Sequence, residues 1–304
     1  MEKVKEIIKK YGVFVIGLAV FIFAAVQLGG IFMDYKKSDD EYENLEESYV
    51  TINTGIEISD EILDEMDTTE GDMLLPQENS QSTENTENTQ STENKKNKED
   101  KTQQQVEQGP WYELASVNMS ALKEKNEDVS GWLLFENVNI SYPILYSGDN
   151  DTYLHTTFEG KSASAGSIFI EAYNTPDFND SHTIIYGHNM KNLSMFGKLK
   201  YYNNNNSYYN NHQYFQIHTE TEKLRYHIFS YHVTDVNGYV YQVPMYPDEE
   251  FAGMIYQMEQ DSNKNTNVYV DENSKIITLS TCVNDDAKRF VIHAVLEDRY
   301  PITQ

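Results

Sequence analysis

The stretch TLSTCVNDDAKRF, residues 278–290, decides the fold and contains the chain's single cysteine, Cys282. Apolar and β-branched residues precede and follow it, and these two runs predict strands over 275–280 and 290–296. The thiol therefore comes just past the carboxyl end of a buried strand. Reactive groups gather at strand ends and in the loops that follow them, so this position indicates a site where chemistry can occur.

Residues 109–304 alternate short strand-like runs with turns. The further predicted strands are 132–135, 140–145, 166–170, 183–186, 214–218, 225–233 and 267–270. Two helices are predicted among them. One begins at Trp111 and ends near Asn126, and the other covers 246–263, with acids in its first turn and apolar residues three and four apart. Many short strands and few helices predict a mainly β domain, built as a barrel or a sandwich.

Residues 13–33, VFVIGLAVFIFAAVQLGGIFM, form a run of 21 residues without a charge. As a helix with a rise of about 1.5 Å per residue, the run spans about 30 Å, the thickness of a bilayer's hydrocarbon core. A buried core helix is disfavoured because the run has no amphipathic pattern. A cleaved signal peptide is an alternative, although its apolar region is only about 7–15 residues long. We therefore predict an uncleaved transmembrane anchor.

Lysines cluster before the apolar run, whereas acidic residues dominate after it. The positive-inside rule then predicts that residues 1–12 are a cytoplasmic tail and that everything after residue 33 lies outside the cell. The predicted localisation is the cell membrane, crossed once, with the folded domain extracellular. The net charge of −26 argues against nucleic acid as a partner, because nucleic-acid binding needs a basic surface.

Residues 34–108 hold 22 acidic residues and 6 lysines. Much of the segment is Gln, Ser, Thr, Asn and Glu, and STENTENTQSTEN forms a degenerate repeat within it. Too little apolar surface is available to offset the entropy of ordering, so residues 34–108 are predicted to be an acidic disordered stalk. The composition changes at Gly109, and residues 109–304 are long enough for one sizeable core.

Outside the cell thiols oxidise in pairs, and a lone cysteine has no internal partner. Cys282 is then either an inert buried hydrophobe or a thiol kept for its chemistry. A thiol with an ordinary pKa of about 8.5 needs a base or a cationic neighbour before it attacks a carbonyl. Arg289 supplies a fixed cation if the six intervening residues fold back; its alternative is a surface ion pair with Asp285 or Asp286.

Among the eight histidines, His188 differs because it follows the apolar run of HTIIYGHNM directly after a glycine. A catalytic base occupies this kind of strand-end position; the alternative is an ordinary surface or core histidine. The sequence contains no HExxH, CxxC or EF-hand pattern, so neither a metal nor another cofactor is predicted.

TLSTC followed by Arg289, together with TIIYGHNM and SMFGKLKYY (residues 194–202), resembles the sortases, and within them class B. The similarity covers most of 112–304, where NEDVSGWL, ISYPILYSGDNDTYL and GSIFIE are similar to successive segments of the family. The predicted helix at 246–263 is similar to one that class B sortases insert between their sixth and seventh strands. His188, Cys282 and Arg289 occur in the family's order, and this combination is far more specific than any one motif.

The resemblance implies an eight-stranded sortase-type β-barrel with an N-terminal helix, and a sortase catalytic domain over residues 109–304. It implies that Cys282 attacks the threonine carbonyl of a sorting signal, of the Asn-Pro-x-Thr type in class B, near the carboxyl terminus of a secreted protein. His188, as imidazolium, would pair with the thiolate and protonate the departing amine, and Arg289 would bind the substrate backbone and the oxyanion. An amine of a peptidoglycan precursor or stem peptide would then resolve the thioacyl enzyme.

Tyr186, Ser280 and Thr281 match positions that line the class B groove, so the resemblance implies substrate binding for them. Their alternative is ordinary strand packing and hydrogen bonding. For the whole protein, wall anchoring, pilus assembly with a pilin lysine as acceptor, and peptide hydrolysis with water as acceptor all stay open. A non-catalytic wall-binding module is disfavoured by the complete set of cysteine, histidine and arginine.

Overall fold

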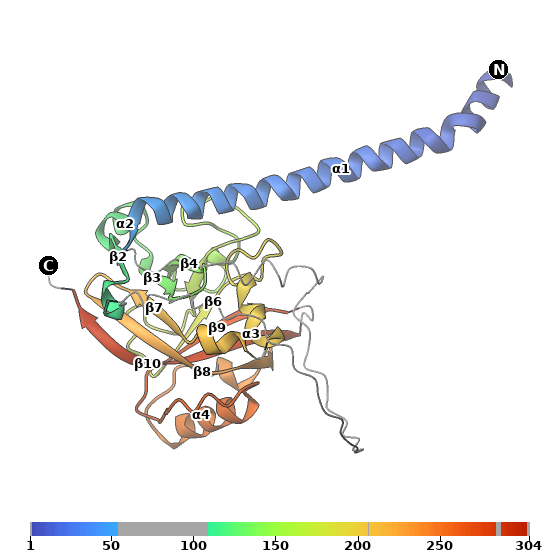
Figure 1. Ribbon diagram of the computed structural model, residues 1–304. Helices are drawn as coiled ribbons and strands as arrows, with labels where there is room; N and C mark the ends of the chain where they lie inside the picture. The colour runs from blue at the N-terminus through green and yellow to red at the C-terminus, as the bar shows by residue number, and fades with distance from the viewer. Residues whose placement is uncertain (1, 54–108, 206, 284–286, 303–304) are drawn as a thin grey trace, which may run out of the picture.

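Eight of the predicted strand-like runs pair with one another and close into a barrel (Figure 1). The computed structural model describes residues 2–53, 109–205, 207–283 and 287–302. The barrel strands are β3 (Val129–Phe135), β4 (Ser141–Leu145), β5 (Ile168–Ile170), β6 (His182–Tyr186), β7 (Tyr214–His218), β8 (Glu222–Asp235), β9 (Ile276–Cys282) and β10 (Lys288–Pro301). Their order around the barrel is β10-β8-β7-β3-β4-β5-β6-β9. The mainly β prediction is confirmed, and the barrel rather than the sandwich is the form it takes.

Two of the strand pairs in the barrel, β4 with β5 and β6 with β9, are parallel, whereas the other pairs are antiparallel. In the β6–β9 pair Tyr186 lies opposite Ser280. Parallel strands run in one direction, so the residues that follow β6 and β9 emerge at the same edge of the sheet. The barrel thereby brings two loops together whose sequences are almost a hundred residues apart.

The barrel interior is filled by large side chains that are removed from water. Trp132, Phe135 and Phe215 are fully buried there, and each buried apolar side chain of this size contributes about 1.5–3 kcal/mol to stability. The indole N–H of Trp132 donates a hydrogen bond to Ser141 Oγ at 2.9 Å, which satisfies the one polar group that this ring brings into the core.

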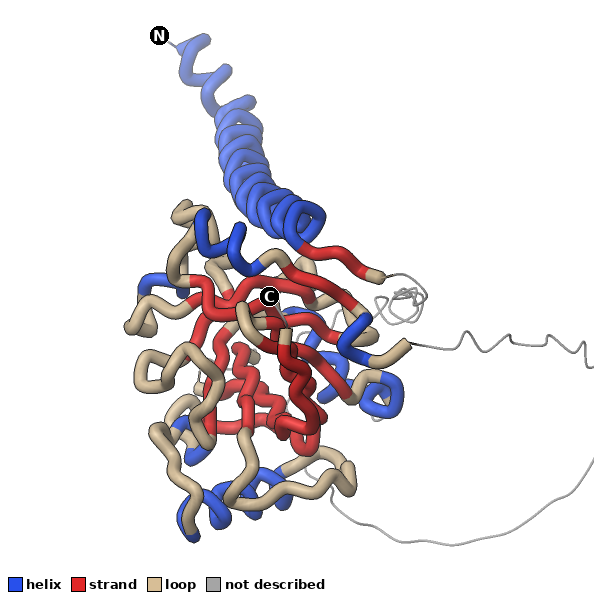
Figure 2. The backbone as a smooth tube through the Cα atoms, turned by 90° about the vertical axis from the view of Figure 1, so that its left-hand side faces the viewer, coloured by secondary structure: helices blue, strands red, loops and turns tan. Residues whose placement is uncertain are grey.

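Helix α4 (Glu249–Asp261) covers the outside of the sheet below β8 and β10 (Figures 1 and 2). It begins at Glu249, three residues after the predicted start, because Asp248 caps it and accepts hydrogen bonds from the backbone N–H groups of Glu250 and Phe251. Its buried face consists of Phe251, Met254, Ile255 and Met258. These side chains form a second apolar cluster with Phe229 and Val291 on the outer face of the barrel.

The region after Trp111 is less helical than predicted. The chain forms a short 3₁₀ turn, η2 (Trp111–Glu113), then strand β2 (Ala115–Val117), and only then helix α2 (Met119–Lys125). The prediction was wrong because β2 pairs with β1 (Val50–Ile52), a partner that lies far away in the sequence. Tertiary pairing here overrides a helical pattern of apolar residues.

The predicted strand at 267–270 is also wrong. These residues form an irregular segment, and Asn267 has a positive φ of 58°, which is incompatible with an extended strand. The remaining short helices are η3 (Thr152–Leu154), η4 (Gly197–Leu199), α3 (Lys200–Asn204), η5 (Tyr208–Asn211) and η6 (Tyr239–Tyr241).

Helix α1 (Glu2–Tyr49) runs through the predicted span and continues onto the barrel, where it lies across the face opposite α4 (Figures 1 and 2). Its apolar part is exposed in the isolated chain, with no residue of the most apolar window buried, and it is long and apolar enough to cross a membrane. Beyond that part, Tyr42 and Leu45 are buried against the barrel. The span is therefore compatible with the predicted membrane anchor.

The prediction of a disordered stalk from residue 34 onward was wrong for the first part of that segment. Residues 34–49 belong to α1, and Val50–Ile52 form β1. Few apolar side chains suffice to order them, because the barrel supplies the surface against which they pack. The rest of the predicted stalk, residues 54–108, lies outside the described residues.

Candidate active site

Cys282 is the last residue of β9 and lies directly opposite Arg289 of β10. Its thiol is free and partly exposed. Directly opposed residues of an antiparallel pair have Cβ atoms about 4.5–5.5 Å apart and point to the same face of the sheet. The strand pairing thus places the Arg289 side chain on the same face of the sheet as the thiol. The alternative partners Asp285 and Asp286 lie outside the described residues.

His188 reaches the same edge from β6. The backbone N–H of Gly187 donates to the carbonyl of Ser280 at 3.1 Å, which extends the β6–β9 pairing by one residue. On the other side of the histidine, Asn189 Nδ2 donates to the carbonyl of Cys282 at 2.9 Å. These two bonds hold the residues before and after His188 against the end of β9, so the structure brings the histidine to the strand end that bears the thiol.

Gly187 is required at its position by close packing. A Cβ atom built there would lie 2.5 Å from Ile168 Cδ1 and 2.6 Å from Phe196 Cδ2. Both contacts are shorter than van der Waals separation, so a larger residue would have to push these side chains away. The glycine lets the backbone that leads to His188 approach the barrel wall.

Burial lowers the pKa of His188, and the charges of His155 and Arg289 lower it further. A hydrogen bond to the carbonyl of Leu154 opposes this change. His188 Nε2 lies 2.7 Å from that carbonyl, which can only accept, so Nε2 carries the proton and donates. A neutral imidazole held in this way has its lone pair on Nδ1. At neutral pH the site therefore favours an imidazole that can take a proton, rather than the standing imidazolium expected from the resemblance.

Arg289 acts on several groups of the site through its charge. It lowers the pKa of His188, and it opposes the rise that burial imposes on the pKa values of Tyr186 and Tyr241. Its Nη1 donates to the carbonyl of Lys288 at 2.8 Å. The guanidinium thus lies among the histidine, the thiol strand and two tyrosines, where it supplies positive charge.

The three predicted substrate-binding residues are placed differently from one another. Tyr186 and Ser280 are opposed across β6 and β9, and Ser280 lies two residues from Cys282, so both share the face of the thiol. Thr281 is opposed to Phe290 of the barrel core and points to the other face. Its side chain is buried, and its hydroxyl has no hydrogen-bond partner among the described residues. The structure therefore brings Tyr186 and Ser280, but not the side chain of Thr281, to the candidate site.

Sequence reasoning missed Tyr241, which lies in η6 above the strand end. Its hydroxyl is 2.8 Å from Ser280 Oγ, and its ring stacks with Tyr186 at a centroid distance of 6.4 Å. Burial raises its pKa to about 12, so it is a neutral hydrogen-bonding group. No sequence pattern pointed to it. Asn189, by contrast, stands next to His188 in the quoted motif, and that adjacency was an available signal.

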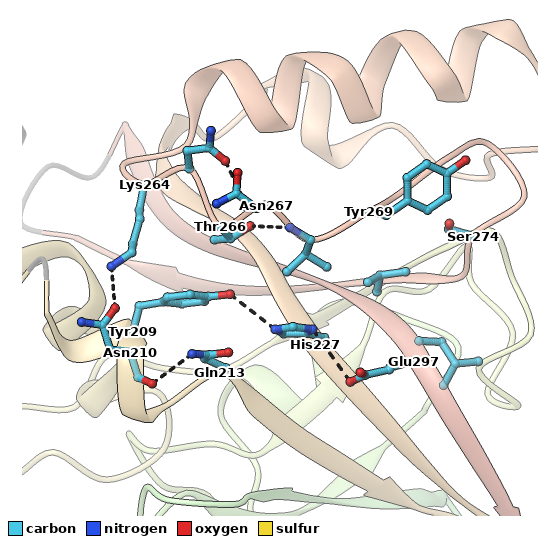
Figure 3. Close-up of a pocket in the computed structure, with 14 residues that line it drawn as sticks. Tyr209, Asn210, Gln213, His227, Lys264, Thr266, Asn267, Tyr269, Ser274 and Glu297 are labelled. Carbon is cyan, nitrogen blue, oxygen red and sulfur yellow. Dashed lines mark hydrogen bonds and ion pairs between the residues drawn. The ribbon is translucent and has the colours of Figure 1, made fainter.

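A cavity of about 690 Å³ lies elsewhere, between η5, the segment after α4 and β10 (Figure 3). His227 Nδ1 and Glu297 Oε2 are 3.8 Å apart in it, and Lys264 Nζ donates to Asn210 Oδ1 at 2.7 Å. The cavity contains none of the residues singled out from the sequence. Among the residues that the structure describes, no cluster of three or more histidine, cysteine, aspartate or glutamate side chains could hold a metal ion.

Comparison with known proteins identifies the family. The family model described as "Sortase domain" matches residues 135–297. The chain is 38% identical over 161 residues to sortase B of Listeria monocytogenes, a match that covers 53% of this chain and 65% of that protein. Over 177 residues it is 27% identical to sortase B of Staphylococcus aureus, covering 57% of this chain and 72% of the relative.

Solved structures agree with the sequence matches. A crystal structure of Clostridium perfringens sortase B superposes with a TM-score of 0.55 and 30% identity, covering 59% of this chain and 99% of that one. A substrate complex of Staphylococcus aureus sortase B gives a TM-score of 0.56 and 26% identity, covering 61% and 85%. The chain therefore belongs to the sortase family of cysteine transpeptidases and, by these relatives, to its class B.

Proposed function

We propose that this protein is a membrane-anchored transpeptidase that cleaves a threonine-containing sorting signal and joins the threonine carboxyl to an amine. One observation carries the proposal. A single free thiol, Cys282, lies directly opposite Arg289, and hydrogen bonds on both sides of His188 hold that histidine at the same strand end. These are the three groups that nucleophilic acyl transfer requires: a nucleophile, a base and a cation for developing negative charge.

In the first half-reaction, Nδ1 of neutral His188 takes the proton of the Cys282 thiol, and the thiolate attacks the threonine carbonyl. The carbonyl oxygen gains the charge of the tetrahedral intermediate, and Arg289 stabilises it. When the intermediate collapses, the carbon–nitrogen bond breaks and the imidazolium gives its proton to the departing amine. A thioester between Cys282 and the threonine carbonyl remains.

In the second half-reaction, an incoming amine attacks the thioester carbonyl while His188 accepts a proton from it. The carbon–sulfur bond breaks, a new amide forms, and the proton returns to the sulfur. Water attacking in place of the amine would release a free carboxylic acid. The identity of the nucleophile therefore separates a transpeptidase from a peptidase, although both use the same three residues.

The surroundings support a role at the cell surface. Helix α1 is long and apolar enough to cross a membrane. We assign it as the anchor, with its amino terminus in the cytoplasm and the barrel outside, because lysines precede the span. One of the similar structures is named a substrate complex of sortase B, which supports a substrate-binding site in this chain also. We assign as substrate a secreted protein with an Asn-Pro-x-Thr-type signal, and as acceptor an amine of a peptidoglycan precursor or stem peptide.

The test is an acyl-transfer assay with the full chain in detergent. A peptide carrying an Asn-Pro-x-Thr-type signal is incubated with and without a stem-peptide amine, and products are identified by mass spectrometry. We expect an amide product when the amine is present and a thioester adduct on Cys282 when it is absent. Cys282→Ala should form neither product. Only free acid from the wild type would establish a peptidase, and transfer only to a lysine-containing pilin peptide would indicate pilus assembly.

A further inference from the structure

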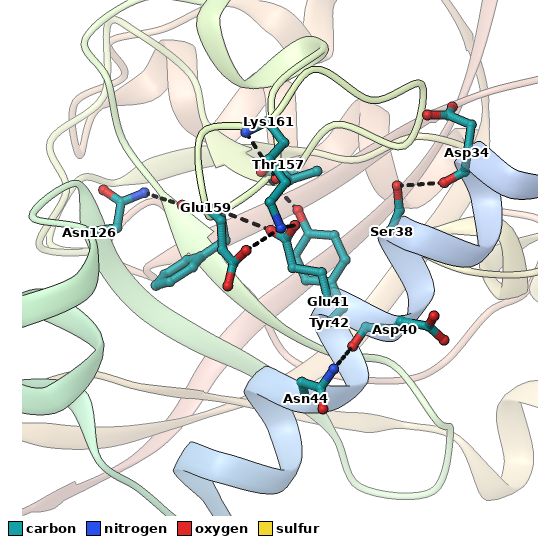
Figure 4. Close-up of polar contacts among 12 residues, drawn as sticks. Asp34, Ser38, Asp40, Glu41, Tyr42, Asn44, Asn126, Thr157, Glu159 and Lys161 are labelled. Carbon is teal, nitrogen blue, oxygen red and sulfur yellow. Dashed lines mark hydrogen bonds and ion pairs between the residues drawn. The ribbon is translucent and has the colours of Figure 1, made fainter.

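The last part of α1, residues 34–49, is here called the docking helix. It lies against two loops next to the histidine, and Figure 4 shows its contacts with the first of them. On one side is the loop of residues 155–167, which leads into β5. On the other side is the loop of residues 189–195, which follows His188 directly. The docking helix is therefore in contact with both of these loops.

The contacts with the first loop are made by buried and paired polar groups. Glu41 Oε1 accepts a hydrogen bond from the backbone N–H of Glu159 at 3.0 Å, and its other oxygen is 3.3 Å from Lys161 Nζ. The Glu41 side chain is only 4% exposed. A carboxylate withdrawn from water to this extent is tolerated when it is paired, so this is a built interface and not a chance contact of a linker.

A continuous line of contacts leads from the docking helix to the histidine. Tyr42, which is 4% exposed, donates its hydroxyl proton to the carbonyl of Gly166 at 2.6 Å. Gly166 has a positive φ of 53°, and a Cβ there would lie 2.5 Å from the carbonyl oxygen of Leu154. That same oxygen accepts the hydrogen bond from His188 Nε2 at 2.7 Å. The Gly166 backbone that accepts the Tyr42 hydrogen bond is thus packed closely against the Leu154 backbone that holds the ring.

A second line of contacts reaches the loop after the histidine. The ring of Tyr42 packs edge-on against Tyr142 at a centroid distance of 5.5 Å, and the Tyr142 hydroxyl accepts from the backbone N–H of Met195 at 3.0 Å. Asp39 Oδ2 accepts from Asn192 Nδ2 at 2.7 Å. Both sides of His188 are therefore held by groups on or next to one face of the docking helix.

We propose that the docking helix is a working part of the active site and that Tyr42 is a positioning residue, which fixes the tautomer and orientation of His188 through Gly166 and Leu154. The catalytic role of this positioning rests on the proposed function. Helix α1 then has a second role besides attachment to the membrane, because its last part also sets the position of His188. A misplacement of a catalytic group by about 1 Å can lower a rate by about 100-fold, so a remote contact of this kind has a measurable effect.

The test compares Tyr42→Phe with Tyr35→Phe in the full chain in detergent. Both substitutions remove one hydroxyl from a tyrosine of the same helix, and the structure gives no hydrogen bond for the Tyr35 hydroxyl among the described residues. We expect Tyr42→Phe to lower kcat about tenfold with KM within about twofold, and Tyr35→Phe to change neither. The acidic limb of the kcat/KM profile should move to lower pH in Tyr42→Phe, because the hydrogen bond from His188 to Leu154, which raises the histidine pKa, is weakened.

A second readout does not depend on turnover. Nitrogen NMR of the His188 ring should report a single Nε2–H tautomer in the wild type and a mixture in Tyr42→Phe. An unchanged tautomer and pH profile, with only a lower thermal midpoint, would show that the helix is merely structural and overturn the inference. If the wild type forms no thioester with any sorting peptide, the proposed function fails, and the NMR comparison still decides the positioning role. If Tyr42→Phe does not fold, Asp39→Ala, which removes the hydrogen bonds of the docking helix to Asn192 and Ser194, tests the contact with the loop after His188 by the same readouts.

Discussion

Cys282 and Arg289 are direct partners across β9 and β10, although six residues separate them in the chain. The pairing places a fixed positive charge on the same face as the sulfur, independent of pH, because a guanidinium does not lose its proton in proteins. A carbonyl held over the thiol would therefore develop its negative charge near a cation that is already in place. The cation itself does not have to be recruited or protonated as that negative charge develops.

Arg289→Ala should lower kcat of acyl transfer by about 100- to 1,000-fold, which is the usual effect of removing a group that stabilises an oxyanion. Arg289→Lys should recover only part of the loss, because an ammonium cannot reproduce the planar fork of the guanidinium. Steady-state kinetics of acyl transfer measure kcat for both variants. Arg299→Ala is the control, since Arg299 is on the same strand and pairs with Glu222 at the surface. Equal rates in Arg289→Ala and Arg299→Ala would rule out the assigned role.

Gly187→Ala should damage both stability and turnover. The new Cβ would press on Ile168 and Phe196, and overpacking of this kind costs about 1–3 kcal/mol of the free energy of unfolding. Because His188 follows immediately, kcat should also fall by at least about tenfold. Chemical denaturation and single-turnover kinetics provide the measurements. Gly253→Ala in α4 is the matched control, since no atom lies within 4 Å of a Cβ built there, and it should leave turnover unchanged.

Stability should fall in mild acid because of histidines buried beneath α4. Burial lowers the pKa values of His182 and His232 to about 4, and it lowers that of His293 well below its ordinary value. In the unfolded chain these histidines become protonated near pH 6.5, whereas in the folded chain they become protonated only at lower pH. The contribution of these neutral histidines to the free energy of unfolding is complete above about pH 6.5. It is lost as the pH falls toward 4, at up to about 1.4 kcal/mol per pH unit for each histidine.

Urea denaturation between pH 7.5 and 4.5 measures this loss. His232→Phe should make the free energy of unfolding depend less steeply on pH, because the phenyl ring binds no proton. The substitution loses no hydrogen bond among the described residues, since neither ring nitrogen of His232 has a partner there. His155→Gln serves as the control, since that residue is exposed. Identical slopes for the wild type and His232→Phe would contradict the prediction.

Tyr241→Phe should weaken substrate binding more than chemistry. It removes the hydroxyl that contacts Ser280 Oγ and leaves the stacking on Tyr186 intact. The Ser280 hydroxyl then loses its fixed orientation toward the substrate. A substrate hydrogen bond lost in this way is worth about 0.5–1.5 kcal/mol, so we expect KM to rise about 2- to 12-fold while kcat stays within about twofold. Peptide titrations measure the two constants separately. Tyr256→Phe on the exposed face of α4 is the comparison, and a larger effect there would refute the assignment of Tyr241 to the groove.

Much of the candidate site was visible in the sequence because its residues stand at the ends of apolar runs. The runs before His188 and Cys282 predicted β6 and β9, and the acidic first turn and apolar spacing of 246–263 predicted α4. These are local patterns, in which the residues that decide the structure lie within a few positions of one another. The family motifs then added the barrel and the order of its parts.

The docking helix is a segment for which prediction from local sequence patterns failed. Tyr35, Ser38, Tyr42, Leu45 and Tyr49 are spaced alternately by three and four residues, which is the pattern of one buried helix face. The many acids between them made the segment look like part of a stalk. Its order comes from a partner surface, and no property of residues 34–49 alone describes that surface.

By itself, then, the sequence determined the eight segments that form the barrel strands, the segment that can cross a membrane, and the side chains that can carry the chemistry. The tertiary structure alone decided that Arg289 faces Cys282, that Thr281 points away from it, and that the end of α1 packs beside the loops around His188. The physical reason is the same in each case. Backbone propensity and apolar spacing act over a few residues, whereas strand register and helix docking depend on pairings between segments that meet only when the barrel closes.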